Sequence, residues 1–351
     1  MGILIGEQDE SRYHKHNGYA GAELARILHR HPEVDIASVT GRSGAGKALG
    51  DVFPHLSDIN IQIEPELTGS LDFVFSALPH AASAEALSEV IAADVKAVDI
   101  SADFRLRDLE TYTEWYGVEH PCPEYLEKSV YGLPEDHREA IAKASVVANP
   151  GCYPTASILG LLPALRHGII DNNIIIDAKS GVSGAGRGLS IKTHFSEVNE
   201  NVSAYGLDGH RHMPEIAQEL DLAYGSEVAL TFVPHLIPMT RGIFATSYSQ
   251  LTNEFLSNNS DPAGAIDALY QETYGQEKYV EVTEVPPSTK QTLGSNQCLV
   301  YPKIDSRTGR LIVVSCIDNL VKGAAGQAVQ NMNILCGYEE STGIDQLAIY
   351  P

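Results

Sequence analysis

The fold is decided by the stretch Ala148-Asn-Pro-Gly-Cys-Tyr-Pro-Thr155, where the chain changes from one kind of element to another. The apolar run that ends at Val147, just before it, is typical of a strand. Pro150 and Gly151 then favour a sharp turn. Pro154 suits the first turn of a helix, because its missing N–H would have no intrahelical partner there. The sequence therefore predicts a strand, a turn and a helix in succession.

Cys152 lies at the start of this predicted helix, which continues through the apolar residues 158–165 and ends at Gly168. Backbone N–H groups and the helix dipole favour a thiolate at such a position, and the thiolate is the reactive form of cysteine. The alternative is a buried structural cysteine. We therefore treat Cys152 as a candidate nucleophile.

Composition limits the class of protein and its partners. A length of 351 residues predicts about two domains. We expect no membrane span and no signal peptide, because no apolar run approaches ~20 residues and no basic segment opens the chain. Five cysteines without a CxxC pair predict a reducing, cytoplasmic location. The net charge of −22 argues against nucleic acid and anionic membranes as partners.

The first 150 residues alternate between predicted strands and helices. Apolar strands separated by helices are typical of a parallel sheet covered on both faces, with ligands at the carboxyl ends of the strands. We predict a Rossmann-type, doubly wound nucleotide-binding domain, with strands at 35–39, 71–78, 95–100 and 145–148 and helices at 20–31 and 80–93.

The second half has a different pattern, in which strands mostly follow one another without a helix between them. The turn Asp305-Ser-Arg-Thr-Gly309 predicts a hairpin. We therefore predict an α+β domain with a mixed or antiparallel sheet, and an α/β fold class for the whole chain. Its predicted strands are 174–178, 228–234, 244–251, 297–304 and 310–317, and its helices are 213–224, 262–274 and 323–336.

A glycine-rich turn at the start of the first helix is a candidate phosphate loop. Gly18, Tyr19, Ala20 and Gly21 are predicted to contact a dinucleotide, because glycines at a helix N-terminus let backbone N–H groups reach phosphates. The alternative is a purely structural turn. The polar segment Glu7–Asn17 separates these glycines from the first strand, and we expect it to be a mobile excursion on this loop.

Arg42 follows the second predicted strand and lies between hydroxyl groups of Thr40 and Ser43. An acidic residue here would bind the ribose of NAD, whereas an arginine suits the 2′-phosphate of NADP. We therefore predict NADP as the cofactor, although a solvated loop arginine is the alternative. Pro79, at the end of strand 71–78, is predicted to contact the cofactor at the same sheet edge.

Three further loops carry candidate binding residues. Arg105, in Ser101-Ala-Asp-Phe-Arg105, suits a phosphate or a carboxylate, with a surface ion pair as the alternative. The loop Ser180–Gly188 has the composition of an anion nest, or of a mobile loop without contacts. Its predicted cofactor contacts, and those of the segment before the last helix, are Ser183, Gly184, Asn319 and Gly323.

His210 precedes a predicted helix in Gly209-His-Arg-His-Met-Pro-Glu215. A neutral histidine beside a thiol can act as a general base and then as a general acid. The competing interpretation is a metal site formed with His212. That pair has an i, i+2 spacing and no further ligands in a known pattern, so we predict no metal.

Together these segments resemble the N-acetyl-γ-glutamyl-phosphate reductases. Ala148–Thr155 is similar to the active-site signature of that family, and the resemblance extends from about Gly18 to the C-terminus. The segments 180–188, 210–215, 232–242 and 319–327 are similar to other family segments. The chain departs from the family pattern at residues 7–17, where the family runs directly from strand to glycines.

The resemblance implies NADPH-dependent reduction of an acyl phosphate in arginine biosynthesis, with release of inorganic phosphate. It makes Cys152 the nucleophile and His210 the acid/base, with Tyr205 and Glu215 near the substrate. We place Arg105 and Asn149 with them as substrate-binding residues.

The resemblance also implies a semialdehyde dehydrogenase fold and a homotetramer or homodimer. The NADP-binding domain would span residues 1–150 and be completed by 319–351, and the catalytic and oligomerisation domain would span 151–318. Two alternatives remain open at this point: a reductase of the longer N-acetyl-aminoadipyl phosphate, and a non-catalytic NADP-binding protein.

Overall fold

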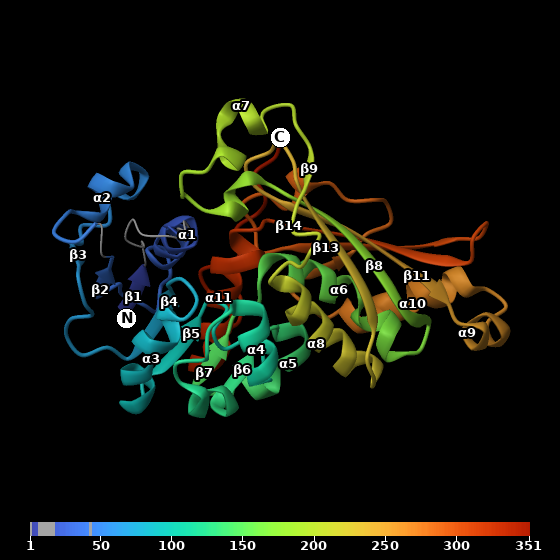
Figure 1. Ribbon diagram of the computed structural model, residues 1–351, viewed down its shortest axis with the longest axis horizontal. Helices are drawn as coiled ribbons and strands as arrows, with labels where there is room; N and C mark the ends of the chain where they lie inside the picture. The colour runs from blue at the N-terminus through green and yellow to red at the C-terminus, as the bar shows by residue number, and fades with distance from the viewer. Residues whose placement is uncertain (1, 6–17, 42–43) are drawn as a thin grey trace. The chain divides into compact units, whose positions relative to one another are not determined.

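A computed structural model describes residues 2–5, 18–41 and 44–351. The predictions for Glu7–Asn17, Arg42 and Ser43 lie outside the described residues. The chain divides into two compact units (Figure 1). Unit 1 comprises Met1–Gly151, Ala185–His194 and Ala324–Gln346, and unit 2 comprises Cys152–Gly184, Phe195–Gly323 and Leu347–Pro351.

Unit 1 contains a seven-stranded sheet in the order β3-β2-β1-β4-β5-β7-β6, and all of its described pairs are parallel. The strand order reverses between β1 and β4, which makes this pair the topological switch point. The predicted doubly wound class is confirmed. The strands are β1 Gly2–Ile5, β2 Ser38–Thr40, β3 Ile63–Glu64, β4 Phe73–Ala77, β5 Lys96–Asp99, β6 Ser129–Tyr131 and β7 Val146–Ala148.

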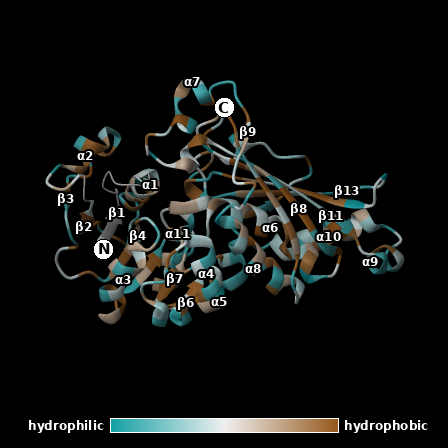
Figure 2. Cartoon of the chain, in the orientation of Figure 1, coloured by the Kyte–Doolittle hydropathy of each residue, from teal (hydrophilic) through white to brown (hydrophobic). Residues whose placement is uncertain are grey.

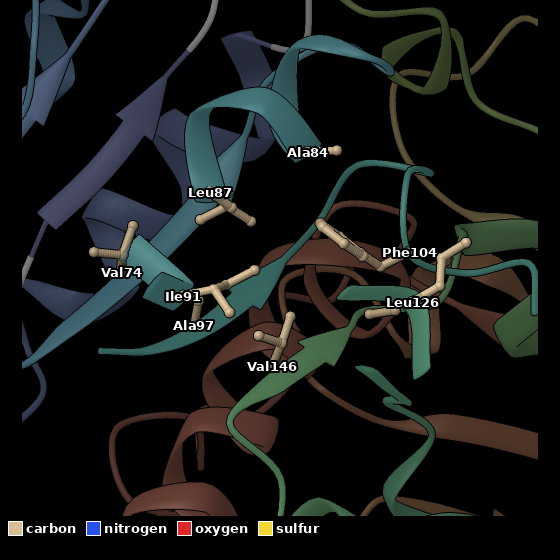
Figure 3. Close-up of a cluster of buried hydrophobic side chains, with 9 residues drawn as sticks. Val74, Ala84, Leu87, Ile91, Ala97, Phe104, Leu126 and Val146 are labelled. Atoms are coloured by element: carbon tan, nitrogen blue, oxygen red, sulfur yellow. The ribbon is translucent and has the colours of Figure 1, made fainter. Parts of the chain in front are cut away.

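The core of unit 1 lies between this sheet and its helices. Leu87 and Ile91 of helix α3 pack with Val74, Ala97 and Val146 of the strands, as Figure 3 shows. Helix α11 contacts α1, α5 and β5. The helices are α1 Gly18–Leu28, α2 Leu49–Val52, α3 Ala82–Ala92, α4 Leu109–Tyr116, α5 Pro134–Ile141 and α11 Gly326–Cys336.

Unit 2 contains a mixed sheet in the order β12-β13-β14-β11-β8-β10-β9. The pairs β8/β10 and β12/β13 are parallel and the others are antiparallel, and β13 and β14 form the predicted hairpin. The strands are β8 Ile170–Ser180, β9 Ser203–Ala204, β10 Ala229–Leu236, β11 Ile243–Leu251, β12 Val280–Val282, β13 Cys298–Asp305 and β14 Arg310–Ile317. Figure 2 shows apolar residues along β11 and β13.

Helix α6 is the central helix of unit 2 and packs against β11, β14 and helix α8. Pro163 inside α6 has no N–H for the carbonyl of Leu159, and the Tyr274 hydroxyl donates to that carbonyl at 2.6 Å instead. The Tyr270 hydroxyl donates to the Gly160 carbonyl at 2.8 Å. The helices of unit 2 are α6 Cys152–Arg166, α7 Phe195–Val198, α8 His212–Tyr224, α9 Asn253–Asn258 and α10 Pro262–Tyr274.

Short turns complete the description. The predicted helix start at Gly323 is wrong, because the chain forms a π-helical turn at Val321–Ala325 and α11 begins only at Gly326.

Within residues 2–5, 18–41 and 44–351, no helix combines the length and hydropathy that a membrane span needs. The 3₁₀ turns are Pro54–Leu56, Pro123–Lys128, Val182–Ala185, Ile191–Thr193 and Thr289–Gln291.

Candidate active site

Cys152 is the first residue of α6 and is half-buried, as the strand–turn–helix pattern predicts. The five cysteines all lie in the described part of the chain and are free thiols. Cys122, Cys298 and Cys316 are buried. Burial raises the pKa of the Cys316 thiol to about 12, so Cys316 stays an unreactive thiol at neutral pH. Cys152 therefore differs from these three in its access to solvent.

The turn that leads to Cys152 is held through Asn149, which is fully buried in unit 1. Its backbone N–H donates to the Asp99 carbonyl at 2.7 Å, and its side-chain amide donates to the Ala324 carbonyl at 3.1 Å. Its side-chain oxygen accepts from Asn331 at 3.0 Å. These contacts fix the end of β7 and the backbone at Asn149 within unit 1.

Arg105 also supports this turn. It is buried, and its Nε donates to the Asn149 carbonyl at 2.8 Å while its Nη2 donates to the Ile100 carbonyl at 2.7 Å. Arg105 and Asn149 therefore lie together in unit 1. Their contact with a substrate remains a prediction.

Gly323 lies directly against Cys152 within unit 2. A Cβ atom at position 323 would be 2.6 Å from the Cβ of Cys152 and 3.1 Å from its Cα. The Gly323 N–H donates to the Asp318 carbonyl at 3.0 Å, within the turn that precedes α11. Glycine is needed here because any side chain would displace the cysteine. The residues next to Gly323 in the sequence do not reveal this role.

His210, which was predicted to assist the thiol, belongs to an aromatic cluster of five rings. The ring centroid of His210 is 5.0–5.6 Å from those of four neighbours, and the cluster consists of Tyr153, Tyr205, His210, His212 and Phe232. Because Tyr153 follows Cys152 directly in the chain, the structure brings the predicted residues Cys152, His210 and Tyr205 into one neighbourhood of unit 2.

The two tyrosines of this cluster form a chain of hydrogen bonds. The Tyr153 hydroxyl donates to the His235 carbonyl at 3.3 Å and lies 3.0 Å from the Tyr205 hydroxyl, in a hydrogen bond in which either group can be the donor. Burial raises the pKa of Tyr205 to about 12, and the nearby Cys152 acts in the same direction. Both hydroxyl groups are therefore neutral donors at physiological pH.

His210 is held as a neutral ring with a defined tautomer. Its Nδ1 accepts the backbone N–H of His212 at 3.1 Å, and a backbone N–H can only donate. Burial lowers the pKa of His210 to about 4. The proton of the neutral ring is therefore on Nε2, which can donate a hydrogen bond to a thiolate or an oxyanion.

Glu215 lies in the first turn of α8 and is fully buried. Its side chain is thus inside unit 2, three positions after the start of the helix that follows His210. Its predicted position near the substrate stays a prediction.

The predicted cofactor residues lie in both units. In unit 1, helix α1 begins at Gly18 and includes Tyr19, Ala20 and Gly21, while Thr40 ends β2 and Pro79 follows β4. In unit 2, Asn319 donates to the Ser183 hydroxyl at 2.9 Å, and Gly184 is beside this pair. Gly323 contacts Cys152 instead, and its contact with a cofactor is untested.

The sequence alone did not show which residues Arg187 contacts. Its Cδ would be 3.0 Å from a Cβ at Gly18, and its guanidinium lies over the Phe53 ring at 4.6 Å from the centroid. The loop 180–188 was a candidate anion site by composition. The structure places its arginine at the N-terminus of α1, where backbone N–H groups and the helix dipole favour phosphate.

Comparisons with known proteins agree with this arrangement. The semialdehyde dehydrogenase NAD binding domain matches residues 16–144, and the semialdehyde dehydrogenase dimerisation domain matches residues 152–319. Aspartate semialdehyde dehydrogenase II from Vibrio cholerae has the same fold, with a TM-score of 0.66, 16% identity and 96% and 98% of the two chains covered. The Candida albicans enzyme with NADP gives a TM-score of 0.65 at 15% identity, covering 95% and 98%. These matches define the semialdehyde dehydrogenase class.

Two curated relatives narrow the class. The N-acetyl-gamma-glutamyl-phosphate reductase of Dehalococcoides mccartyi strain BAV1 is 51% identical over 335 residues, which cover 95% of this chain and 96% of the relative. That of Desulforamulus reducens is 48% identical over 345 residues, covering 95% and 97%. The chain belongs to the semialdehyde dehydrogenase family and, within it, to the N-acetyl-γ-glutamyl-phosphate reductases.

The contact between Gly323 and Cys152 can be tested by Gly323→Ala. The added methyl group must displace the cysteine, because the two Cβ atoms would be only 2.6 Å apart. We expect the rate of alkylation of Cys152 to change and kcat to fall by about tenfold or more, since small displacements of a reacting group are costly. Mass spectrometry of iodoacetamide-treated protein measures the first effect, with exposed Cys336 as internal reference. Unchanged alkylation and kcat would contradict the contact.

The Nε2–H tautomer of His210 can be tested by comparing His210→Gln with His210→Asn. A glutamine amide can donate from near the position of Nε2, whereas the shorter asparagine cannot. We expect His210→Asn to lower kcat by roughly 10²–10⁴ and His210→Gln to lose much less. In ¹⁵N spectra of the wild type, the ring should remain a neutral Nε2–H imidazole between about pH 5 and 8. Equal losses in both variants, or titration near pH 6.5, would refute this assignment.

Proposed function

We propose that this protein reduces N-acetyl-γ-glutamyl phosphate to N-acetylglutamate 5-semialdehyde, with NADPH as reductant and inorganic phosphate as product, in arginine biosynthesis. The observation that carries the proposal is the half-buried Cys152 at the N-terminus of α6, next in sequence to Tyr153 of the aromatic cluster that holds His210. The names of the curated relatives support the same reaction.

The first step is acyl transfer to Cys152. The thiolate attacks the acyl carbon, a C–S bond forms, and the C–O bond to phosphate breaks as inorganic phosphate leaves. N–H groups at the start of α6 are placed to stabilise the thiolate before the attack and the acyl oxyanion during it.

The second step reduces the thioester. Bound NADPH supplies a hydride to the acyl carbon. The C–S bond then breaks to release the aldehyde and the Cys152 thiolate, and the Nε2–H group of His210 is positioned to stabilise the departing sulfur by donating a hydrogen bond to it. Tyr205, held by Tyr153, is proposed to orient the substrate.

The residues of unit 1 fit a dinucleotide phosphate. Gly18 and Gly21 lie in the first turn of α1, where the absence of a side chain lets a phosphate approach the backbone N–H groups closely. Arg187 adds a positive charge beside Gly18. We propose NADP rather than NAD, a preference that also rests on Arg42 and on the NADP in the Candida albicans relative.

The outer face of the unit 2 sheet supports a homodimer or homotetramer. Ile175, Tyr248 and Ile312 lie side by side in register across β8, β11 and β14, and Ile175 is 44% exposed. A row of apolar residues on a sheet face is typical of a surface that another chain covers. The matching family segment is a dimerisation domain.

The reaction is tested in reverse with the wild type and Cys152→Ser. We expect phosphate-dependent reduction of NADP⁺ by N-acetylglutamate semialdehyde in the wild type, and less than about a tenth of kcat in the variant, because a serine hydroxyl is a far weaker nucleophile. Binding of NADPH should be nearly unchanged. A faster reaction with the one-carbon-longer semialdehyde would favour the aminoadipyl substrate, and a wild type without any activity would favour a non-catalytic role.

The oligomer is tested by Ile175→Asp, with Leu222→Asp as the control. Leu222 is also exposed, at 61%, but it lies on α8 rather than on the sheet face. A carboxylate at position 175 should weaken self-association, because burying it in an interface leaves an unpaired charge. Size-exclusion chromatography with light scattering should show dissociation only for Ile175→Asp. Equal masses for both variants would place the interface elsewhere.

A further inference from the structure

The turn after β4 contains a residue in an unfavourable backbone conformation. Ala81 has φ 67° and ψ −37°, and it is the residue that precedes helix α3. A non-glycine residue with positive φ costs free energy and persists only where its surroundings hold it. β4 is one of the two strands at the switch point, so this turn stands at the edge where the proposed function places the cofactor.

Asp103 holds this turn from another part of the sequence. Its carboxylate accepts the backbone N–H of Ala81 at 2.6 Å and that of Ala84 at 2.8 Å. An alanine before a helix has no side-chain oxygen to accept the free N–H groups of the first turn. Asp103 therefore supplies the cap that the local sequence of α3 lacks, and the same two bonds keep Ala81 in its conformation.

Helix α4 supports the turn from two sides. The Tyr112 hydroxyl donates to Asp103 at 3.0 Å, and Tyr112 is fully buried. The Tyr112 ring packs on the Tyr116 ring with centroids 4.7 Å apart, and Tyr116 contacts the His80 ring at 5.5 Å. Two tyrosines of α4 thus contact Asp103 and His80, the middle residue of the turn Pro79–Ala81.

A second buried carboxylate, that of Asp99, connects Asp103 to the sheet through hydrogen bonds. Asp99, at the end of β5, accepts from the hydroxyl of Ser83 at 2.6 Å and from that of Ser101 at 2.7 Å. The Ser101 hydroxyl in turn accepts the N–H of Asp103 at 3.2 Å. Burial raises the pKa of Asp99, and the neighbouring Asp103 acts in the same direction. Two adjacent buried carboxyl groups are costly, which argues for a role beyond simple packing.

We propose that Asp103 is a positioning residue for the dinucleotide: it holds the turn Pro79–Ala81 in the strained conformation that the bound cofactor requires. The inference rests on the proposed function, because it assumes that a dinucleotide binds at this sheet edge. It assigns the motif Ser101–Arg105 to shaping the cofactor site through the backbone. The motif need not touch a ligand for this role.

The test is the dissociation constant of NADPH for Asp103→Asn, measured by nucleotide fluorescence. An asparagine side chain cannot accept two N–H bonds with both of its terminal atoms, so the turn should relax. We expect the dissociation constant and the KM for NADPH to rise by about tenfold, while kcat at saturating NADPH changes little. Alkylation of Cys152 should be unchanged.

Three further variants separate positioning from stability. Asp261→Asn is the matched control, because Asp261 also caps a helix by accepting the N–H of Gly264, and that helix, α10, belongs to unit 2. It should leave NADPH binding unchanged. Ala81→Gly in the Asp103→Asn background should restore most of the affinity, because glycine adopts positive φ without strain. If Asp103→Asn does not fold, Tyr112→Phe removes one donor to the same carboxylate and should raise the dissociation constant by several-fold.

The outcomes distinguish this inference from the function on which it rests. If the wild type binds NADPH and the folded variants Asp103→Asn and Tyr112→Phe bind it within about twofold of the wild type, the positioning role is refuted. It is also refuted if Ala81→Gly restores thermal stability to Asp103→Asn but leaves its affinity low. If the wild type binds neither NADPH nor NADH, the proposed function itself fails.

Discussion

The structure of unit 1 around the candidate site depends on one constraint, the fixed end of β7 at Asn149. Asn149 satisfies it with hydrogen bonds to a neighbouring strand end, to Asn331 of α11 and to the backbone at Ala324. Arg105 binds the carbonyl of the same residue. Because these groups are buried, removing one partner would leave others unsatisfied at a cost of about 1–3 kcal/mol each. The shape of the turn that follows β7 therefore depends on buried contacts within unit 1 as well as on the turn residues themselves.

Local sequence predicted the elements of this region well and their long-range contacts poorly. The start of α6 at Cys152 follows from the prolines and glycine around it, and the hairpin of β13 and β14 follows from its turn residues. The close approach of Gly323 to Cys152 joins residues far apart in sequence, so no periodicity could reveal it. The π-helical turn beside it was missed because its residues also fit an ordinary helix.

The sequence did not predict that the charged residues Asp103 and Arg105 are buried. Arg105 follows a strand end and has the composition of an anion clamp, yet two of its nitrogen atoms donate to backbone carbonyls inside unit 1. Asp103, two residues earlier, accepts backbone N–H groups at the start of α3. Residue type and topology locate such groups at the correct edge of the sheet. Whether they face solvent or the interior depends on contacts outside the motif, such as the one between Asp103 and Tyr112 of α4.

The proposed function requires a protein with a net charge of −22 to bind two anions. The global field opposes an acyl phosphate and a dinucleotide, so attraction must come from groups close to each ligand. Helix α1 begins at the buried Gly18 with Arg187 beside it, and helix α6 begins at Cys152. Free N–H groups at a helix N-terminus act over a few ångströms, where distant surface carboxylates are screened by salt. Local dipoles can therefore prevail over the overall charge.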